Sequence, residues 1–144
     1  MQKSSYYNMV IFLHPLESII NINSKLINYF NCNIYDLFLN NYCLEYYNIL
    51  KKIYPNSCMV LEKNKEHIAI LIDDAIYDVT GLRENNDFIL ADSSNINFVN
   101  SFYKKFDSNT KRDLYLNIFG NSIKKKWIFC IYIYFFFNFT IFLL

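Results

Sequence analysis

The sequence predicts an α+β fold: N-terminal helices pack on a small antiparallel sheet, and a C-terminal hydrophobic (transmembrane) helix follows. Three observations predict it: apolar residues at helical spacing before Tyr54, short β-branched segments within residues 58–79, and an uncharged apolar segment at 127–144. With 144 residues, the chain is expected to form one domain, residues 1–120. A basic juxtamembrane segment, 121–126, then leads into the membrane anchor, 127–144.

The first predicted helix follows Pro15, a residue that suits the first turn of a helix because its missing N–H has no acceptor there. Residues 6–13 precede it and are either a first strand or the approach to this helix. An apolar stripe at helical spacing runs along it. The stripe consists of Leu16, Ile19, Ile20, Leu26, Ile27 and Phe30.

A second helix is predicted from about Tyr42 to Ile53. Asn40 and Asn41 precede it and offer side-chain caps for its free N–H groups. Pro55 ends it, and a short apolar segment, 34–39, lies before the caps.

The hydrophobic period then changes to that of strands. Residues 58–61 form a short apolar strand, and residues 67–72 form a second, richer in β-branched side chains. Asp73–Asp74 is a turn, and residues 75–79 return as the partner strand. Gly81 closes this hairpin, since glycine takes positive φ without steric strain.

Two amphipathic helices are predicted after the sheet, at residues 94–106 and 108–119. Phe98, Phe102 and Phe106 lie on one face of the first, and we expect this face to be core. No internal repeat is visible, so the chain is expected to be one α+β unit with an appended tail.

The tail from Trp127 to Leu144 carries no charge. At ~1.5 Å per residue it spans roughly 27 Å, close to the ~30 Å hydrocarbon core of a bilayer. Lys124–Lys126 precedes it, which favours a single-pass anchor in the lipid bilayer with the N-terminal domain in the cytoplasm. Two alternatives are a terminal element buried in the domain and an apolar string without a role.

Composition excludes several classes of function. The net charge is +1 and the one tight basic cluster, Lys124–Lys126, adjoins the tail, so no nucleic-acid surface is expected. The four cysteines form no CxxC pair, which argues against a metal site and favours free thiols. Asp73 and Asp74 lack the further ligands of a Ca²⁺ site, and no cofactor motif is present.

Cys43, His67 and Asp78 have the chemistry of a catalytic triad. Cys43 falls in the first turn of the second helix, where unpaired backbone N–H groups and the helix dipole stabilise a thiolate. A thiolate is the species that attacks a carbonyl carbon. Taken singly, each residue also has an ordinary structural interpretation: a small buried thiol, a surface histidine at a strand end, and a turn aspartate.

The length of the hairpin turn decides whether Asp78 reaches His67. If Asp73–Asp74 is a two-residue loop, Ala69 faces Asp78, and His67 becomes its diagonal neighbour on one face, about 7 Å away by backbone. A carboxylate there holds the imidazole tautomer and supports its charged form. A three-residue loop would shift the register by one and turn Asp78 to the opposite face.

The segments CLEYYNIL and HIAILIDDAIYDVTGL resemble the papain-like and transglutaminase-like thiol hydrolases, in particular small phage and bacterial members. In these families a Cys begins a helix packed on an antiparallel sheet, a His starts one strand, and an Asp or Asn follows on the next. The resemblance covers roughly residues 34–92. It implies that Cys43 is the nucleophile, His67 the general base and acid, and Asp78 the orienting carboxylate.

The chain also departs from that pattern. Such families commonly have a small residue before the Cys and Ala in the helix after it, where this chain has Tyr42, Tyr46 and Tyr47. No Trp follows the Cys, and Asn40 or Asn41 is the available candidate for a second oxyanion donor. A pseudoenzyme that keeps the fold without the activity is therefore an alternative.

Together, these patterns predict a membrane-anchored cysteine hydrolase or acyl transferase, without cofactor, acting through Cys43, His67 and Asp78. Its substrate is an unknown peptide, amide or thioester, because loops such as 83–95 carry no recognisable signature. Two alternatives stay open: a non-catalytic, membrane-anchored interaction module, and a small membrane protein of undefined activity.

Overall fold

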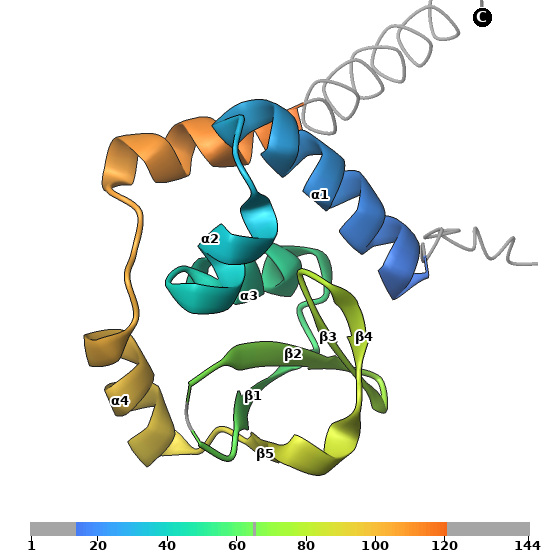
Figure 1. The fold of residues 1–144 in the computed structure, drawn as a ribbon, viewed down its shortest axis with the longest axis vertical. Coiled ribbons are helices and arrows are strands. Elements are labelled where there is room, and N and C mark those ends of the chain that lie inside the picture. Colours follow the sequence, from blue (N-terminus) through green and yellow to red (C-terminus); the bar gives the residue numbers. More distant parts are fainter. Residues whose placement is uncertain (1–13, 65, 121–144) are drawn as a thin grey trace, which may run out of the picture.

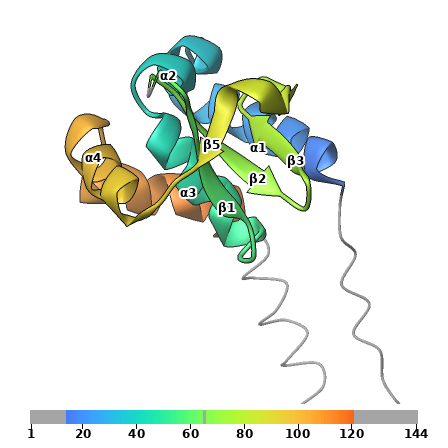
Figure 2. The ribbon, with the colours of Figure 1, turned by 90° about the horizontal axis from the view of Figure 1, so that it is seen from below.

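A computed structural model describes residues 14–64 and 66–120, and within them the predicted α+β class is confirmed (Figures 1 and 2). Three helices come first, a five-stranded antiparallel sheet follows, and two helices end the described chain, the last over residues 108–120. The other elements are α1 (Pro15–Phe30), α2 (Ile34–Asn40), α3 (Cys43–Ile53), β1 (Cys58–Glu62), β2 (Ile68–Ile72), β3 (Ala75–Asp78), β4 (Gly81–Arg83), the 3-10 turn η1 (Asn85–Asp87), β5 (Phe88–Leu90) and α4 (Ser93–Phe102).

Helix α1 begins at Pro15 as predicted, with His14 as its N-cap. Its buried face is narrower than the predicted stripe. Ile20 and Ile27, assigned to the stripe, are 69% and 44% exposed, so the prediction is wrong for these two. The side chains of α1 that enter the core lie at i, i+3 and i+7, and they are Ile19, Ile22 and Leu26.

The predicted cap of the second helix is wrong. Asn40 is the last residue of α2, because the apolar segment 34–39 is itself helical with Asn33 as its cap. Tyr42 occupies the N-cap of α3 and makes no side-chain capping bond. Asn40 and Asn41 are both exposed and contribute no cap to α3.

The strands form one sheet in the order β4-β3-β2-β1-β5. The predicted two-residue turn is confirmed, because Ile72 pairs with Ala75 and Asp73 takes a left-handed φ of 44°. Strands β4 and β5 were not predicted. A second tight turn joins β3 to β4 and places Gly81, with φ 109°, opposite Asp78.

The sheet curls strongly, so that its edge strands approach each other. In a flat sheet the outer strands β4 and β5 would lie ~19 Å apart, four spacings of ~4.8 Å. Residues 84–87 alone connect them, and three of these form η1, which advances by only ~2 Å per residue. The curl brings Arg83 of β4 to within 3.8 Å of Glu62 of β1. Its inner face holds a small apolar cluster made by Val60, Ala69, Ile76 and Phe88.

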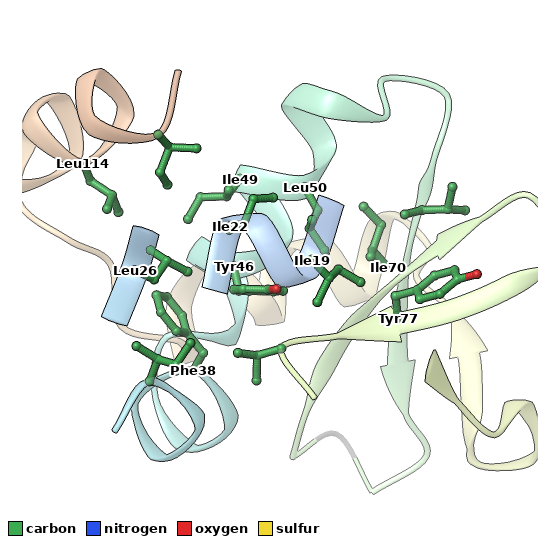
Figure 3. Packing of buried hydrophobic residues seen from close by; sticks show 14 residues of the cluster. Ile19, Ile22, Leu26, Phe38, Tyr46, Ile49, Leu50, Ile70, Tyr77 and Leu114 are labelled. Atoms are coloured by element: carbon green, nitrogen blue, oxygen red, sulfur yellow. The ribbon is translucent and has the colours of Figure 1, made fainter. Parts of the chain in front are cut away.

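The main core lies between the opposite face of the sheet and the helices (Figure 3). Tyr46 of α3 donates a hydrogen bond to the Asn23 side chain at 2.8 Å, and Asn23 donates to the Val79 carbonyl at 2.8 Å. These buried bonds fix α3, α1 and the β3–β4 turn relative to one another. Large apolar side chains fill the rest, among them Phe38, Ile49, Leu50, Ile70 and Leu114.

Helix α4 ends at Phe102, and the predicted continuation to residue 106 is wrong. Phe102 is 63% exposed, so it is not part of a buried face. Phe106 lies beyond the helix and stacks on Tyr42, with ring centroids 4.5 Å apart. The chain leaves the helical path at Tyr103, which has extended dihedral angles. The helix predicted at 108–119 is confirmed as residues 108–120.

Several predicted segments lie outside the described residues: the N-terminal stretch 6–13, the basic segment 121–126 and the anchor 127–144. Over residues 14–64 and 66–120, no helix combines the length and apolar character needed to cross a bilayer.

Candidate functional site

Cys43 is the first residue of α3 and is 2% exposed. It packs with Leu61 of β1 and Ile68 of β2, because α3 lies across this end of the sheet. Val99 and Tyr103, from α4 and its C-terminal end, belong to the same cluster. Cys43 thus lies at the end of α3 where the first backbone N–H groups lack intrahelical acceptors.

His67 directly precedes β2 and is 7% exposed. Its Nε2 lies 3.0 Å from Oδ2 of Asp78. The ring meets Phe88 edge to face, with centroids 6.5 Å apart. The other ring nitrogen, Nδ1, is buried and has no hydrogen-bond partner of standard geometry among the described residues. Few buried polar atoms of folded proteins are left in this state.

Asp78 is the last residue of β3 and is 2% exposed. Oδ1 accepts hydrogen bonds from the backbone N–H of Thr80 at 2.7 Å and from its hydroxyl at 2.6 Å. Oδ2 faces His67 and, at 3.2 Å, the Arg83 guanidinium. Burial acts to raise the pKa of Asp78, but the hydrogen bonds from His67 and Thr80 outweigh it, and the pKa is lowered.

The charge state of His67 reflects both neighbours. Burial alone would lower the pKa of His67, since a charged imidazole is less well solvated in the protein. The hydrogen bond to Asp78 and the interaction with the Cys43 thiol outweigh burial and raise this pKa to about 9. Because Asp78 occupies Nε2, the free Nδ1 is the nitrogen left for Cys43. The protonated imidazole therefore lies between a carboxylate and a thiol.

The structure thus brings together the three residues singled out in the sequence. The two-residue turn gives His67 and Asp78 the diagonal placement expected, and their side chains meet. Cys43 interacts with the His67 side chain, and the packing of α3 on β2 brings the two together. Their catalytic roles stay predictions.

Two polar members of the site were not identified from the sequence, Thr80 and Arg83. Both follow from the β3–β4 turn, because pairing Asp78 with Gly81 places Arg83 opposite Ile76 and on the face of Asp78. Extending the register argument past Gly81 would have found Arg83.

Tyr103 was also missed, and no sequence signal connects it to Cys43. It is buried at the end of α4 beside Cys43. Burial is the largest cause that raises the pKa of Tyr103 well above its ordinary value, and electrostatic interactions with Cys43, Glu62 and Glu66 add to it.

Other polar residues considered in the sequence have structural roles. Asp73 and Asp74 are exposed in the β2–β3 turn, and Asp92 caps α4 in a reciprocal capping box with Asn95. Across the described chain, no group of three or more His, Cys, Asp or Glu side chains could hold a metal ion. A surface hollow of about 490 Å³ lies elsewhere, lined by Lys52, Arg112, Tyr115, Leu116 and Phe119.

A known protein family matches most of the chain. Residues 19–128 match a family model described as Phage YunG-like protein. This region contains all but the first four residues of α1 and every described element after it, including all residues of the site. No curated protein and no solved structure matches the chain significantly.

Proposed function

The chain belongs to the Phage YunG-like protein family, and we propose that it is a thiol hydrolase or acyl transferase acting on an amide or thioester. Cys43 is the nucleophile, His67 the general acid and base, and Asp78 the carboxylate that orients the imidazole. The order of these residues, on a helix start, a strand start and the next strand, resembles that of the papain-like and transglutaminase-like enzymes.

One observation carries the proposal: His67 is held by Asp78 through Nε2, while its buried Nδ1 is left without a standard partner near Cys43. An ordinary core histidine satisfies both ring nitrogens. A histidine that lends a proton to substrate keeps one nitrogen available. The pKa of about 9 keeps the imidazole charged at neutral pH, and a neighbouring imidazolium favours the thiolate form of a cysteine.

The reaction follows from this arrangement. The Cys43 thiolate attacks the substrate carbonyl carbon, the bond from that carbon to the leaving nitrogen or sulfur breaks, and the protonated His67 gives its Nδ1 proton to the leaving group. A thioester on Cys43 remains. Neutral His67 then takes a proton from water, or from an acceptor amine, as it attacks the thioester, and the sulfur leaves as thiolate beside a protonated His67.

The test uses a small activated thioester and the full-length chain at pH 7. Mass spectrometry is expected to find the acyl group on Cys43, despite its burial, ahead of the exposed Cys32 and Cys58. His67→Ala should slow acylation of Cys43 by about 10²-fold or more. His14→Ala is the matched control, since the chain has only two histidines, and should leave the rate unchanged.

Acylation that is equal at Cys32, Cys43 and Cys58, or a rate at Cys43 that does not change when His67 is lost, would contradict the proposal. The second candidate is a non-catalytic interaction module, and the burial of Cys43 and His67 favours it. In that case Cys43 stays unmodified, and His67→Ala lowers the thermal stability without changing any reaction at the thiol.

We further propose that Trp127–Leu144 anchors the chain in a lipid bilayer, with the N-terminal domain in the cytoplasm. The support is the sequence: an uncharged apolar segment of spanning length, preceded by Lys124–Lys126. Fractionation of cells compares the full-length chain with one that ends at Lys126. The full-length chain should sediment with membranes and need detergent for release. Recovery of both forms in the soluble fraction would exclude the anchor.

A further inference from the structure

Arg83 shares the carboxylate oxygen on which His67 depends. Its Nη1 lies 3.2 Å from Oδ2 of Asp78, and His67 Nε2 lies 3.0 Å from the same atom. The Asp78 side chain is almost wholly buried, whereas that of Arg83 is 34% exposed. Arg83 also lies 3.8 Å from Glu62 and packs near the Phe88 ring. The curl of the sheet creates these contacts, because β1 and β4 are not neighbouring strands.

Arg83 is not needed to orient Asp78. Thr80 already fixes the carboxylate through two hydrogen bonds to Oδ1, and the strand β3 fixes its backbone. What Arg83 adds is a positive charge at Oδ2. A second cation beside the same oxygen repels the proton on His67 and stabilises the carboxylate when that proton leaves.

The proposed reaction makes such a charge useful. When His67 gives its proton to the leaving group, the buried Asp78 loses its positive partner. An uncompensated buried carboxylate is strongly disfavoured, so proton transfer from His67 would be slow. Arg83 remains charged throughout, because a guanidinium does not lose its proton in proteins.

We propose that Arg83 is a positioning residue that keeps Asp78 ionised after His67 loses its proton, and that limits how tightly His67 holds that proton. Its use in turnover rests on the proposed thiol chemistry, whereas the coupling between Arg83 and His67 does not. The titratable groups that act on His67 are Asp78 of β3 and Cys43 of α3. Arg83 of β4 and Tyr46 of α3 interact with Asp78, Glu62 of β1 contacts Arg83, and Tyr103 after α4 interacts with Cys43, Glu62 and Glu66.

The coupling is measured by an NMR titration of the imidazole resonances. His14 and His67 are the only histidines, so a His14→Gln variant assigns both signals. Removal of the cation in Arg83→Gln is expected to raise the midpoint of His67 by about half a pH unit or more. Arg83→Lys keeps the charge and should restore a midpoint close to that of the unmodified chain.

Arg112→Gln is the matched control, since it removes one arginine from an exposed ion pair with Asp113 on the last helix. It should leave the His67 midpoint unchanged. If Arg83→Gln does not fold, Arg83→Thr replaces it, because threonine suits an edge strand and is neutral. A midpoint that stays or falls in the neutral variant that folds overturns the proposal, since a merely structural arginine would not control this titration.

The titration involves no turnover, so it is separable from the acylation test. If the His67 midpoint rises but Cys43 is not acylated, the coupling between Arg83 and His67 is supported and the thiol hydrolase proposal is contradicted. If Cys43 is acylated but the midpoint does not rise, the thiol hydrolase proposal is supported and the coupling is contradicted. If both hold, the alkaline limb of the acylation rate should move upward in Arg83→Gln, together with the His67 midpoint.

Discussion

The two oxygens of Asp78 have different tasks. Oδ1 closes the β3–β4 turn by accepting two hydrogen bonds from Thr80, and Oδ2 faces the cations His67 and Arg83. Asp78 therefore stabilises the turn and contributes to the candidate site at the same time. The ordinary explanation of an aspartate before a glycine turn holds here for one oxygen only.

Asp78→Asn separates these tasks, since the amide oxygen still accepts from Thr80 while the negative charge is lost. We expect the pKa of His67 to fall from about 9, because the negative charge of Asp78 no longer offsets the effect of burial, which lowers this pKa. Acylation of Cys43 at pH 7 should slow by about 10²-fold or more, as in triads that lose their carboxylate. Thr80→Val is the control; it removes one bond to Oδ1 and keeps the charge. An unchanged rate in Asp78→Asn would exclude Asp78 from the reaction.

The pH dependence of stability follows from the raised pKa of His67. The folded value of about 9 lies above the ordinary 6.5, so the contribution is complete below pH 6.5 and is lost as the pH rises through 9. The lowered pKa of Asp78 gives stability that is present above its ordinary 3.8 and lost as the pH falls through the lower folded value. Tm should be roughly 5 °C lower at pH 9.5 than at pH 6.5.

Differential scanning calorimetry checks this, with His67→Gln as the comparison. The variant should show little change of Tm over the same interval. The measurement stops at pH 9.5 because tyrosines of the unfolded chain begin to ionise above that pH. The buried Tyr46 and Tyr103 have pKa values above their ordinary 10 in the folded chain, so their ionisation on unfolding would add a second pH dependence. If Tm falls as steeply between pH 6.5 and pH 9.5 in His67→Gln, the pH dependence of stability comes from groups other than His67.

Among the elements, those with a repeated period or a defined turn were predictable. Helix α3, β2, β3 and the two-residue turn follow from apolar spacing and from Asp73–Asp74, and with them the contact of His67 with Asp78. Strands β4 and β5 were missed because each has three residues, too few to show alternation. The end of α4 was missed because Phe106 continues the helical spacing, whereas tertiary packing on Tyr42 takes it out of the helix.

Gly81 makes the β3–β4 turn possible. Its φ of 109° is unfavourable for any residue with a side chain, although an added Cβ would have space, at 3.5 Å from Leu16. We expect Gly81→Ala to lower the free energy of unfolding by about 1–2 kcal/mol in urea denaturation. Gly120→Ala is the matched control; Gly120 is helical with nothing within 4 Å, so this change should be neutral or mildly stabilising. Equal effects would show that backbone strain is unimportant at Gly81.

At the scale of the molecule, a buried carboxylate connects the site-bearing helix to the end of the described chain. Glu45 of α3 is 1% exposed and accepts a hydrogen bond from Lys111 at 3.0 Å and one from the backbone N–H of Phe106 at 3.3 Å. Both partners lie more than sixty positions away along the chain. This distance explains why composition and spacing gave no sign of the contact.

Lys111→Met leaves the Glu45 carboxylate buried without its cation. We expect a loss of about 2–3 kcal/mol in the free energy of unfolding, because an unpaired buried charge is costly and Lys111 is partly exposed to water. The double variant Glu45→Gln, Lys111→Met should recover part of this loss. Arg112→Gln, which breaks an exposed ion pair, should change stability by less than about 0.5 kcal/mol. Urea denaturation measures all three, and a single and double variant of equal stability would contradict the explanation.

The polar groups of the site are unevenly distributed along the chain. One stretch of the chain, residues 67–83, supplies most of them: His67, Asp78, Thr80 and Arg83. Its consecutive strands and turns hold these side chains in contact with one another. Cys43 and Tyr103 come from other parts of the chain, and Cys43 is placed by the packing of the first turn of α3 on Leu61 and Ile68. The Cys43 sulfur and the charged hairpin are thus held together by one apolar contact, between the start of α3 and strands β1 and β2. A repacking there that slid the helix by about one ångström would disconnect nucleophile from base while every ion pair stayed intact.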